Sequence, residues 1–230
     1  MGEGAGNEQA LMPFIHSANI ACGYHAGNEE TMRQVIQLCL QYGVHIGAHP
    51  SFMDKENFGR TEMKLPAGTI YNLVTEQLKI IAAIATTYEA TLHHVKPHGA
   101  LYNMAAKNSL IANEIAQAVK DFNTSLLYYG LSGSVMINEA AKLGLKTVNE
   151  VFADRTYQDD GSLTPRNQPN ALLIDVYEVQ KQVAKFMKEN KVTTITGKDI
   201  FIQADTICIH GDGPHAVDFA NAVYKQLHEV

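Results

Sequence analysis

Four groups of polar residues, each with at least one histidine, directly follow short apolar segments of the chain. The groups are His25 in ACGYHAG, His49 in IGAHP, the set His94, Lys96 and His98 in HVKPHG, and His210 in ICIHGD. Imidazoles transfer protons near neutral pH and bind transition metals. The spacing therefore indicates an acid–base site or a metal site, provided that the fold brings the groups together.

Each apolar segment is expected to be a buried β-strand that leads into a helix. In the first such helix Asn28 is the N-cap, Glu29 and Glu30 suit the first turn, and Gly43 ends the helix. Six strand-then-helix units favour an α/β fold with a parallel sheet. We expect strands at 17–22, 44–48, 92–96, 126–129, 147–152 and 206–210, and further helices at 69–88, 110–122, 134–143, 176–188 and 216–227. An open doubly wound sheet and a closed β/α barrel both fit this order. Since no linker or composition shift divides the chain, we predict one domain over residues 1–230.

Ligands of parallel α/β folds bind where the carboxyl ends of the strands meet, so the four groups should face one space. A single histidine at a strand end is more often a capping or core residue than a ligand. Four groups at equivalent ends favour a functional site. The histidines without this placement are expected to be structural or surface residues: His16, His45, His93, His215 and His228.

The residue types leave the chemistry of the site open. Two or three histidines with a carboxylate would suit zinc or another divalent transition metal. No HExxH or HxxxH spacing on a helix is present, so histidines that move protons without a metal are an alternative. Asp154 and Arg155 follow a strand and could orient a substrate carboxylate or form a salt bridge. Lys96 could bind an anion or tether a loop.

Composition excludes several classes of protein. The chain has 18 basic and 24 acidic residues, a formal net charge of −6 and no Lys/Arg-rich run, so we expect no nucleic-acid partner. Apolar stretches are far shorter than the roughly 20 residues of a membrane span. Three scattered cysteines and no secretory signal favour a reduced, cytoplasmic protein. Neither a GxGxxG nor a GxxxxGK[ST] nucleotide motif occurs.

Six long strings stand out: SANIACGYHAGN, GVHIGAHPSF, ENFGR, HVKPHGALYN, EVFADRTYQDDGSLTPR and ICIHGDGPHA. Together they closely resemble the LamB/YcsF family over nearly the whole chain. The resemblance implies a seven-stranded β/α barrel like that of glycoside hydrolases and polysaccharide deacetylases. It also implies ATP-dependent opening of the lactam of 5-oxo-L-proline to L-glutamate, together with 5-oxoprolinase subunits B and C.

The resemblance also implies roles for individual residues. Deacetylase-like relatives hold a divalent metal with one aspartate and two histidines, so His25 and His49 are the expected metal pair and His98 a third candidate. The remaining candidates are catalytic Glu3, Lys96, His98, Asp154, His210 and Asp212, and substrate-binding Asn19, Arg60, Lys96 and Arg155.

One departure from the family pattern concerns the N-terminus. Members usually begin with a strand of the type DLNxDxGEG, whereas this chain starts at Met1 within that motif and retains only Glu3. We therefore expect the first strand and its aspartates to be missing and two unpaired sheet edges to be exposed. Two other functions stay open: a stand-alone metal-dependent deacetylase or hydrolase of carbohydrate-like or N-acyl substrates, and a non-catalytic scaffold subunit. Self-association into a homo-oligomer is also open.

Overall fold

The computed structural model describes residues 1–228, and the chain divides into two compact units. The first unit comprises Met1–Gly130 and Ser134–Thr147, and the second comprises Leu131–Gly133 and Val148–Val230. The single domain expected over residues 1–230 stays a prediction, and the two units are described separately.

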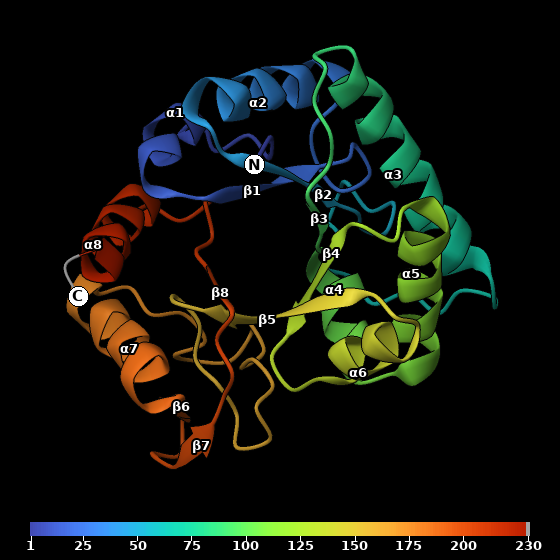
Figure 1. Cartoon of the computed structure of the whole chain (residues 1–230). Helices are drawn as coiled ribbons and strands as arrows, with labels where there is room; N and C mark the ends of the chain where they lie inside the picture. Colours follow the sequence, from blue (N-terminus) through green and yellow to red (C-terminus); the bar gives the residue numbers. More distant parts are fainter. Residues whose placement is uncertain (229–230) are drawn as a thin grey trace. The chain divides into compact units, whose positions relative to one another are not determined.

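The first unit is a parallel sheet with helical crossovers. Its strands pair in the order β1 (Ser17–Ala21), β2 (His45–His49), β3 (His94–Val95) and β4 (Leu127–Leu131). Its helices are α1 (Glu8–Leu11), the 3-10 helix η1 (Met12–Phe14), α2 (Glu29–Tyr42), α3 (Thr69–Thr86), α4 (Gly99–Ala105), α5 (Ser109–Phe122) and α6 (Val135–Lys142). Figure 1 shows α2, α3 and α5 on the outer side of these strands. The register aligns Asn19 with Gly47 and Gly47 with His94, so these three residues share one row across the sheet.

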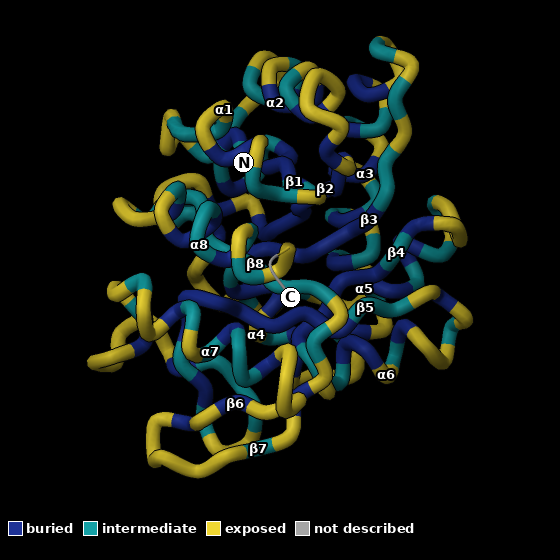
Figure 2. The backbone as a smooth tube through the Cα atoms, turned by 60° about the vertical axis from the view of Figure 1, so that its left-hand side comes forward, coloured by how far each residue is buried: buried dark blue, intermediate teal, exposed yellow. Residues whose placement is uncertain are grey.

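The boundaries of α2 follow from its sequence. The Asn28 side chain accepts from Thr31 N–H and the Thr31 hydroxyl accepts from Asn28 N–H, which forms a capping box. Gly43 ends the helix in the left-handed conformation at φ 69°. One face of α2 is buried through Met32, Val35 and related residues, and its turns alternate between buried and exposed in Figure 2.

The helix α3 receives its N-terminal cap from another helix. Gly68, its N-cap residue, has no side chain to accept the first amide protons. The Glu114 carboxylate of α5 accepts instead from the N–H groups of Gly68, Ile70 and Tyr71 at 2.8–3.2 Å. This contact fastens the start of α3 to α5.

The outer edge of β1 is in contact with the N-terminal residue. Met1 N donates to Asn19 O at 2.8 Å, and Ala21 N donates to Met1 O at 3.0 Å. This pair of hydrogen bonds has the pattern of a parallel ladder, with Met1 beside Ile20. The described residues therefore cover part of the β1 edge, one of the two edges that the sequence predicts to be open, and a missing preceding strand stays a prediction.

The second unit combines a parallel pair with a small hairpin. In it β5 (Lys146–Phe152) pairs with β8 (Thr206–Cys208) in parallel, and β6 (Lys191–Thr193) pairs with β7 (Asp199–Phe201) antiparallel. Its helices are α7 (Val176–Glu189) and α8 (Ala216–His228), which pack together. The loop after β5 is held by isolated bridges from Arg155 to Leu172 and from Tyr157 to Leu163.

The predicted α/β class with parallel strands is confirmed. The described residues contain six parallel strands, so the seven strands implied by the family resemblance are not found. The strand expected at 92–96 is reduced to His94–Val95, and the last one ends at Cys208, which leaves His210 in the loop beyond it. The elements α1, η1, α4, β6 and β7 lie outside the predicted set.

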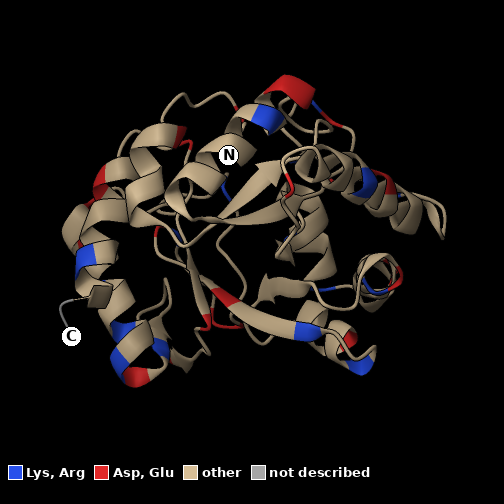
Figure 3. Cartoon of the chain, turned by 45° about the horizontal axis from the view of Figure 1, so that its top comes forward, with Lys and Arg blue, Asp and Glu red and all other residues tan. Residues whose placement is uncertain are grey.

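Apolar side chains are buried between the helices and strands of each unit, and charged side chains lie on the helices. Buried apolar side chains line the sheets and the inner faces of the helices, with Tyr128, Tyr157 and Phe52 among the largest. Basic and acidic residues are interspersed over the helices in Figure 3, with no large region of one sign on the face shown. Within the described residues, no helix has the length and apolar character needed to cross a bilayer.

Candidate metal centre

Three side chains of the first unit converge at the carboxyl end of β2. Glu3 comes from the N-terminal segment, His49 is the last residue of β2, and His98 is the N-cap residue of α4. One ligand atom of each lies within 4.8 Å of the other two. Both histidines are buried, and the Glu3 side chain is 13% exposed. The three residues form a group that could hold a metal ion.

Backbone carbonyl groups decide where the two imidazoles carry their protons. His49 Nδ1 lies 2.6 Å from Lys96 O, and His98 Nε2 lies 2.9 Å from Phe58 O. A carbonyl oxygen only accepts, so each of these ring nitrogens must carry a proton. The other two nitrogens, His49 Nε2 and His98 Nδ1, face each other at 3.0 Å. In neutral rings this contact brings together two lone pairs with no proton between them.

Burial keeps both rings neutral. It holds the pKa of His49 well below its ordinary value, and the neighbouring His98 adds to the effect. Burial also lowers the pKa of His98 to about 3, with a further contribution from His25. Neither ring takes up a second proton at neutral pH, so protonation does not relieve the contact between the lone pairs.

A cation would relieve this contact, and the geometry fits one. Two nitrogens at about 2.0–2.1 Å from zinc, with a bond angle between about 90° and 110°, lie about 2.9–3.4 Å apart. The separation of 3.0 Å between His49 Nε2 and His98 Nδ1 falls in this interval. Glu3 Oε1, 3.8 Å from His98 Nδ1, adds a carboxylate. Two imidazoles and one carboxylate suit zinc or a similar divalent metal.

His25 holds Glu3 and does not belong to the group of ligand atoms. Its Nδ1 lies 2.9 Å from Ser51 Oγ, which in turn lies 2.8 Å from Phe52 O. Its Nε2 lies 3.0 Å from Glu3 Oε1. Burial alone would raise the pKa of Glu3, but the N-terminal ammonium group and His25 hold it well below its ordinary value. The sequence predicts His25 as a metal ligand, whereas the structure gives its two nitrogens other partners.

Three residues predicted to bind substrate also belong to the first unit. Asn19 Oδ1 lies 2.9 Å from His94 Nε2 and is engaged within the sheet. Lys96 is buried directly after β3, with its Nζ 5.7 Å from the centre of the Tyr102 ring. Arg60 is exposed, and its guanidinium group lies 4.7 Å from the centre of the Phe58 ring. Contact of these residues with a substrate stays a prediction.

The second unit contains an Asp–His pair of its own. Both carboxylate oxygens of Asp154 lie 2.9 Å from His210 Nδ1, and Oδ2 also accepts from the His210 backbone N–H. Among the described residues, His210 Nε2 has no hydrogen-bond partner. A carboxylate that orients an imidazole in this way prepares it for proton transfer. The catalytic role expected for the two residues stays a prediction.

Two other candidates of the second unit lie in different surroundings. Arg155 is buried and donates to Ala171 O and Thr164 O, which fixes the loop after β5. Burial lowers the pKa of Arg155 to about 10. Asp212 is exposed beyond β8. Their predicted roles in substrate binding and catalysis stay predictions.

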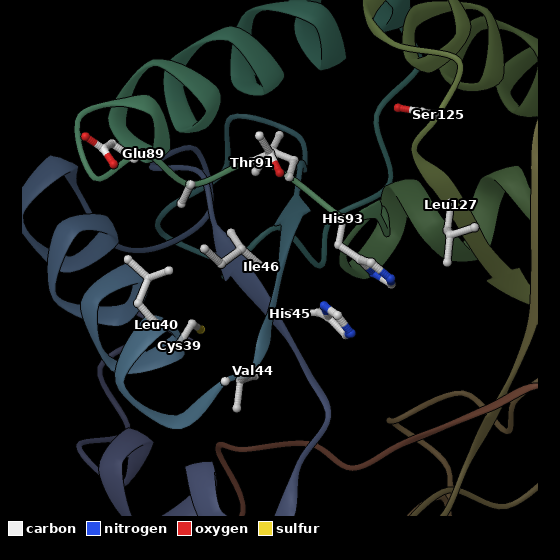
Figure 4. A pocket seen from close by; sticks show the side chains of 13 residues that line it. Cys39, Leu40, Val44, His45, Ile46, Glu89, Thr91, His93, Ser125 and Leu127 are labelled. Carbon is white, nitrogen blue, oxygen red and sulfur yellow. The ribbon is translucent and has the colours of Figure 1, made fainter.

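A second group of histidines lies at the amino-terminal end of β2 and β3, again within the first unit. His45 and His93 stack with ring centres 4.1 Å apart and line a pocket of about 570 Å³ with apolar residues such as Leu40 and Leu127 (Figure 4). His93 Nδ1 lies 3.2 Å from the Nδ1 of buried His94. Since Asn19 Oδ1 accepts from His94 Nε2, His94 Nδ1 is an acceptor and His93 Nδ1 its donor.

Sequence reasoning missed several groups that shape these two sites. Ser51 stands two residues after His49 and its hydroxyl contacts His25 Nδ1, and a hydroxyl so close to a predicted ligand is a usable signal. The roles of the Lys96 and Phe58 carbonyl groups could not be predicted, because every residue type carries a backbone carbonyl group. His93 lacks a strand-end position, and the structure places it in the second histidine group.

Two comparisons place this architecture among known proteins. The model of the LamB/YcsF family matches residues 1–230. The structure is similar to the crystal structure of a lactam utilization protein from Thermus thermophilus, with 38% sequence identity and a TM-score of 0.91. The match covers 99% of this chain and 92% of the other.

Proposed function

Because the chain belongs to the LamB/YcsF family, we propose that it opens a cyclic amide by hydrolysis, as one subunit of an ATP-dependent 5-oxoprolinase. In this reaction water adds to the lactam of 5-oxo-L-proline and L-glutamate is released, with subunits B and C as partners. The similarity to a lactam utilization protein supports a lactam substrate. The observation that carries the proposal is the pair of lone pairs on His49 and His98 beside Glu3, which suits a hydrolytic metal centre.

The chemistry of the substrate explains what such a centre must do. A five-membered lactam is an unactivated amide, so its carbonyl carbon needs activation before water can attack. A divalent ion, when bound, supplies a Lewis acid for the carbonyl oxygen and lowers the pKa of a bound water. His49, His98 and Glu3 would hold the ion, and the His25 N–H would keep the Glu3 carboxylate in place. The carboxylate of 5-oxoproline needs a cationic partner, for which Lys96 and Arg60 are the candidates of this unit.

ATP enters the proposal as the second means of activation. Transfer of the γ-phosphoryl group of ATP to the amide oxygen releases ADP and makes the ring carbon more electrophilic. After water adds to this carbon, the C–N bond breaks and the nitrogen leaves as the amino group, and the resulting acyl phosphate is hydrolysed by a second water to L-glutamate and phosphate. The chain carries neither of the two glycine-rich nucleotide motifs named above. We therefore assign the ATP-dependent step to the complete complex with subunits B and C.

The test is glutamate formation by the reconstituted complex. Purified chain, subunits B and C, 5-oxoproline and ATP are combined, and glutamate is measured with and without the chain. We expect turnover only in the complete mixture. His49→Gln and His98→Gln should abolish it, because each removes one nitrogen ligand, whereas His16→Ala, at an exposed position, should retain it.

Two outcomes would overturn the proposal in different ways. Equal glutamate formation without this chain would show that it is not a catalytic subunit and would favour a scaffold role. Hydrolysis of N-acyl substrates by the zinc-loaded chain alone, without ATP, would favour the deacetylase-like alternative.

A further inference from the structure

A turn over the metal centre supplies the carbonyl group that decides the proton position of His98. The turn spans residues 54–61 and follows β2 by five residues. Phe58 O accepts from His98 Nε2 at 2.9 Å, which leaves Nδ1 as the lone pair that faces His49. If this acceptor were absent, His98 Nδ1 could carry the proton and donate it to His49 Nε2 across the same 3.0 Å. The carbonyl group of Phe58 therefore chooses between a metal-binding pair and an ordinary hydrogen bond.

Asp54 holds the turn in this conformation. Its Oδ1 accepts from Asn57 N and from Asn57 Nδ2 at 3.3 and 2.8 Å, and its Oδ2 accepts from Thr61 N at 3.2 Å. The hydrogen bonds from Asn57 and Thr61 keep the pKa of Asp54 below its ordinary value. The side chain is buried, and its two oxygens bond to both ends of the segment that carries Phe58. Asp54 is thus the polar centre of the turn.

Backbone contacts then seat the turn on the segment that carries His98. Gly59 N donates to Asp54 O at 2.7 Å, and Ala100 N donates to Gly59 O at 2.9 Å. Gly59 has φ +65°, and a Cβ there would lie 2.8 Å from His25 Cβ and 3.1 Å from His98 Cδ2. A Cβ at Gly99 would overlap the Gly59 carbonyl group. The approach requires glycine at both positions and leaves the turn little freedom to shift.

Phe58 itself adopts a strained conformation. Its φ is 57°, a left-handed value that is strained for a bulky residue. Its ring contacts His25 and His98 edge-on, with ring centres 5.5 and 5.3 Å apart. Such strain persists only where the surroundings fix the backbone, and here they fix the direction of the Phe58 carbonyl group.

We propose that Asp54 is a positioning residue of the metal centre, which holds the 54–61 turn so that Phe58 O keeps the proton of His98 on Nε2. The inference rests on the proposed metal site and adds the element that prepares its ligand. Loss of the Asp54 carboxylate frees the turn, and His98 then donates from Nδ1 to His49 Nε2. In that arrangement His98 Nδ1 carries a proton and the lone pair of His49 Nε2 accepts a hydrogen bond, so neither nitrogen is open to a metal.

The experiment reads the proton position directly. Imidazole nitrogen NMR of the metal-free chain, labelled with ¹⁵N-histidine, distinguishes a protonated Nε2 from a protonated Nδ1 at His98. We expect Nε2–H in the wild type and Nδ1–H in Asp54→Ala. Zn²⁺ affinity, measured by competition with a chelator, should fall about 10–100-fold, as for other outer residues of metal sites.

Asp205→Ala is the matched control. Asp205 Oδ2 also accepts from the backbone N and the Nδ2 of an asparagine, Asn149, at 2.8 and 2.9 Å. The control should lower the unfolding temperature in a similar way and leave the His98 tautomer and the Zn²⁺ affinity unchanged.

A second variant covers the case that Asp54→Ala does not fold. Asp54→Asn has one oxygen, which cannot serve both Asn57 and Thr61, and should show a smaller shift in the same direction. Nε2–H at His98 in folded Asp54→Ala would overturn the proposal, and so would a His98 tautomer population in folded Asp54→Asn that equals that of the wild type. If wild-type chain binds no Zn²⁺, the metal centre fails, while the NMR result still decides the role of Asp54.

Discussion

The two histidine groups of the first unit lie at opposite ends of the same strands, and their protons are distributed differently. In the group at the amino ends, every contact along Asn19, His94 and His93 joins a donor to an acceptor. In the group at the carboxyl ends, His49 and His98 meet with two lone pairs. The difference arises from the acceptors on the far side of each ring: a side-chain amide for His94, and backbone carbonyl groups for His49 and His98. Clustered histidines therefore suit a metal only where acceptors on the far side of each ring hold the proton on the far nitrogen and leave the inner nitrogens unprotonated.

The largest expected effect separates the two groups by metal binding. His49→Gln should lower Zn²⁺ affinity by more than about 100-fold, because loss of a ligand exceeds the cost of about 10–100-fold seen for outer residues. His94→Gln should leave the affinity within about twofold of wild type, because this ring has no part in the ligand group. Calorimetric titration of both variants measures the contrast. A metal that binds His94→Gln as weakly as His49→Gln would break the comparison.

A smaller effect concerns the glycine beside each group. A Cβ at Gly47 would overlap the His94 ring, so Gly47→Ala should cost about 1–3 kcal/mol of folding stability and spare Zn²⁺ affinity. Gly59→Ala should cost a similar amount and also weaken Zn²⁺ binding, since its Cβ would press on His25 and His98. Urea unfolding and Zn²⁺ competition on the same preparations test both claims. Equal Zn²⁺ affinities in the two variants would contradict them.

The most gradual effect is a slope in the stability of the folded chain with pH. Burial lowers the pKa of His94 to about 3, and the charges of His93, Lys96 and His45 act in the same direction. The unfolded chain takes up a proton at this residue below about pH 6.5, whereas the folded chain does not until about pH 3. Stability is therefore lost as pH falls through this window, by up to about 1.4 kcal/mol per pH unit for one proton.

His94→Gln should remove the contribution of His94 to the pH dependence of the free energy of unfolding. The contributions of the other buried histidines should remain. Free energies of unfolding from urea titrations at pH 7, 6, 5 and 4 measure it. An unchanged slope in the variant would show that His94 is protonated in the folded chain.

The succession of strands and helices along the chain and the position of His49 could be predicted because they depend on local patterns. Asn28 and Gly43 predicted both ends of α2, and the apolar segment before His49 predicted its place at the end of β2. The hairpin of β6 and β7 could not be predicted, because strands of three residues are too short to show a periodic pattern.

The different roles of His25 and His49 could not be predicted from the sequence either. His25 and His49 look equivalent, since each follows a strand and a small residue. Their roles diverge because Ser51 and Glu3 occupy the nitrogens of His25, whereas Lys96 O leaves one nitrogen of His49 open. Such choices depend on carbonyl directions that only the folded backbone defines.

The cap that Glu114 provides for α3 bears on how the first unit opens. The amides of Gly68, Ile70 and Tyr71 are protected by a carboxylate on α5. They can exchange hydrogen with solvent only after this carboxylate moves away. Their exchange rates therefore report how often α3 and α5 separate. Because the Glu114 contact joins the two helices, we expect α3 and α5 to unfold together as one cooperative unit.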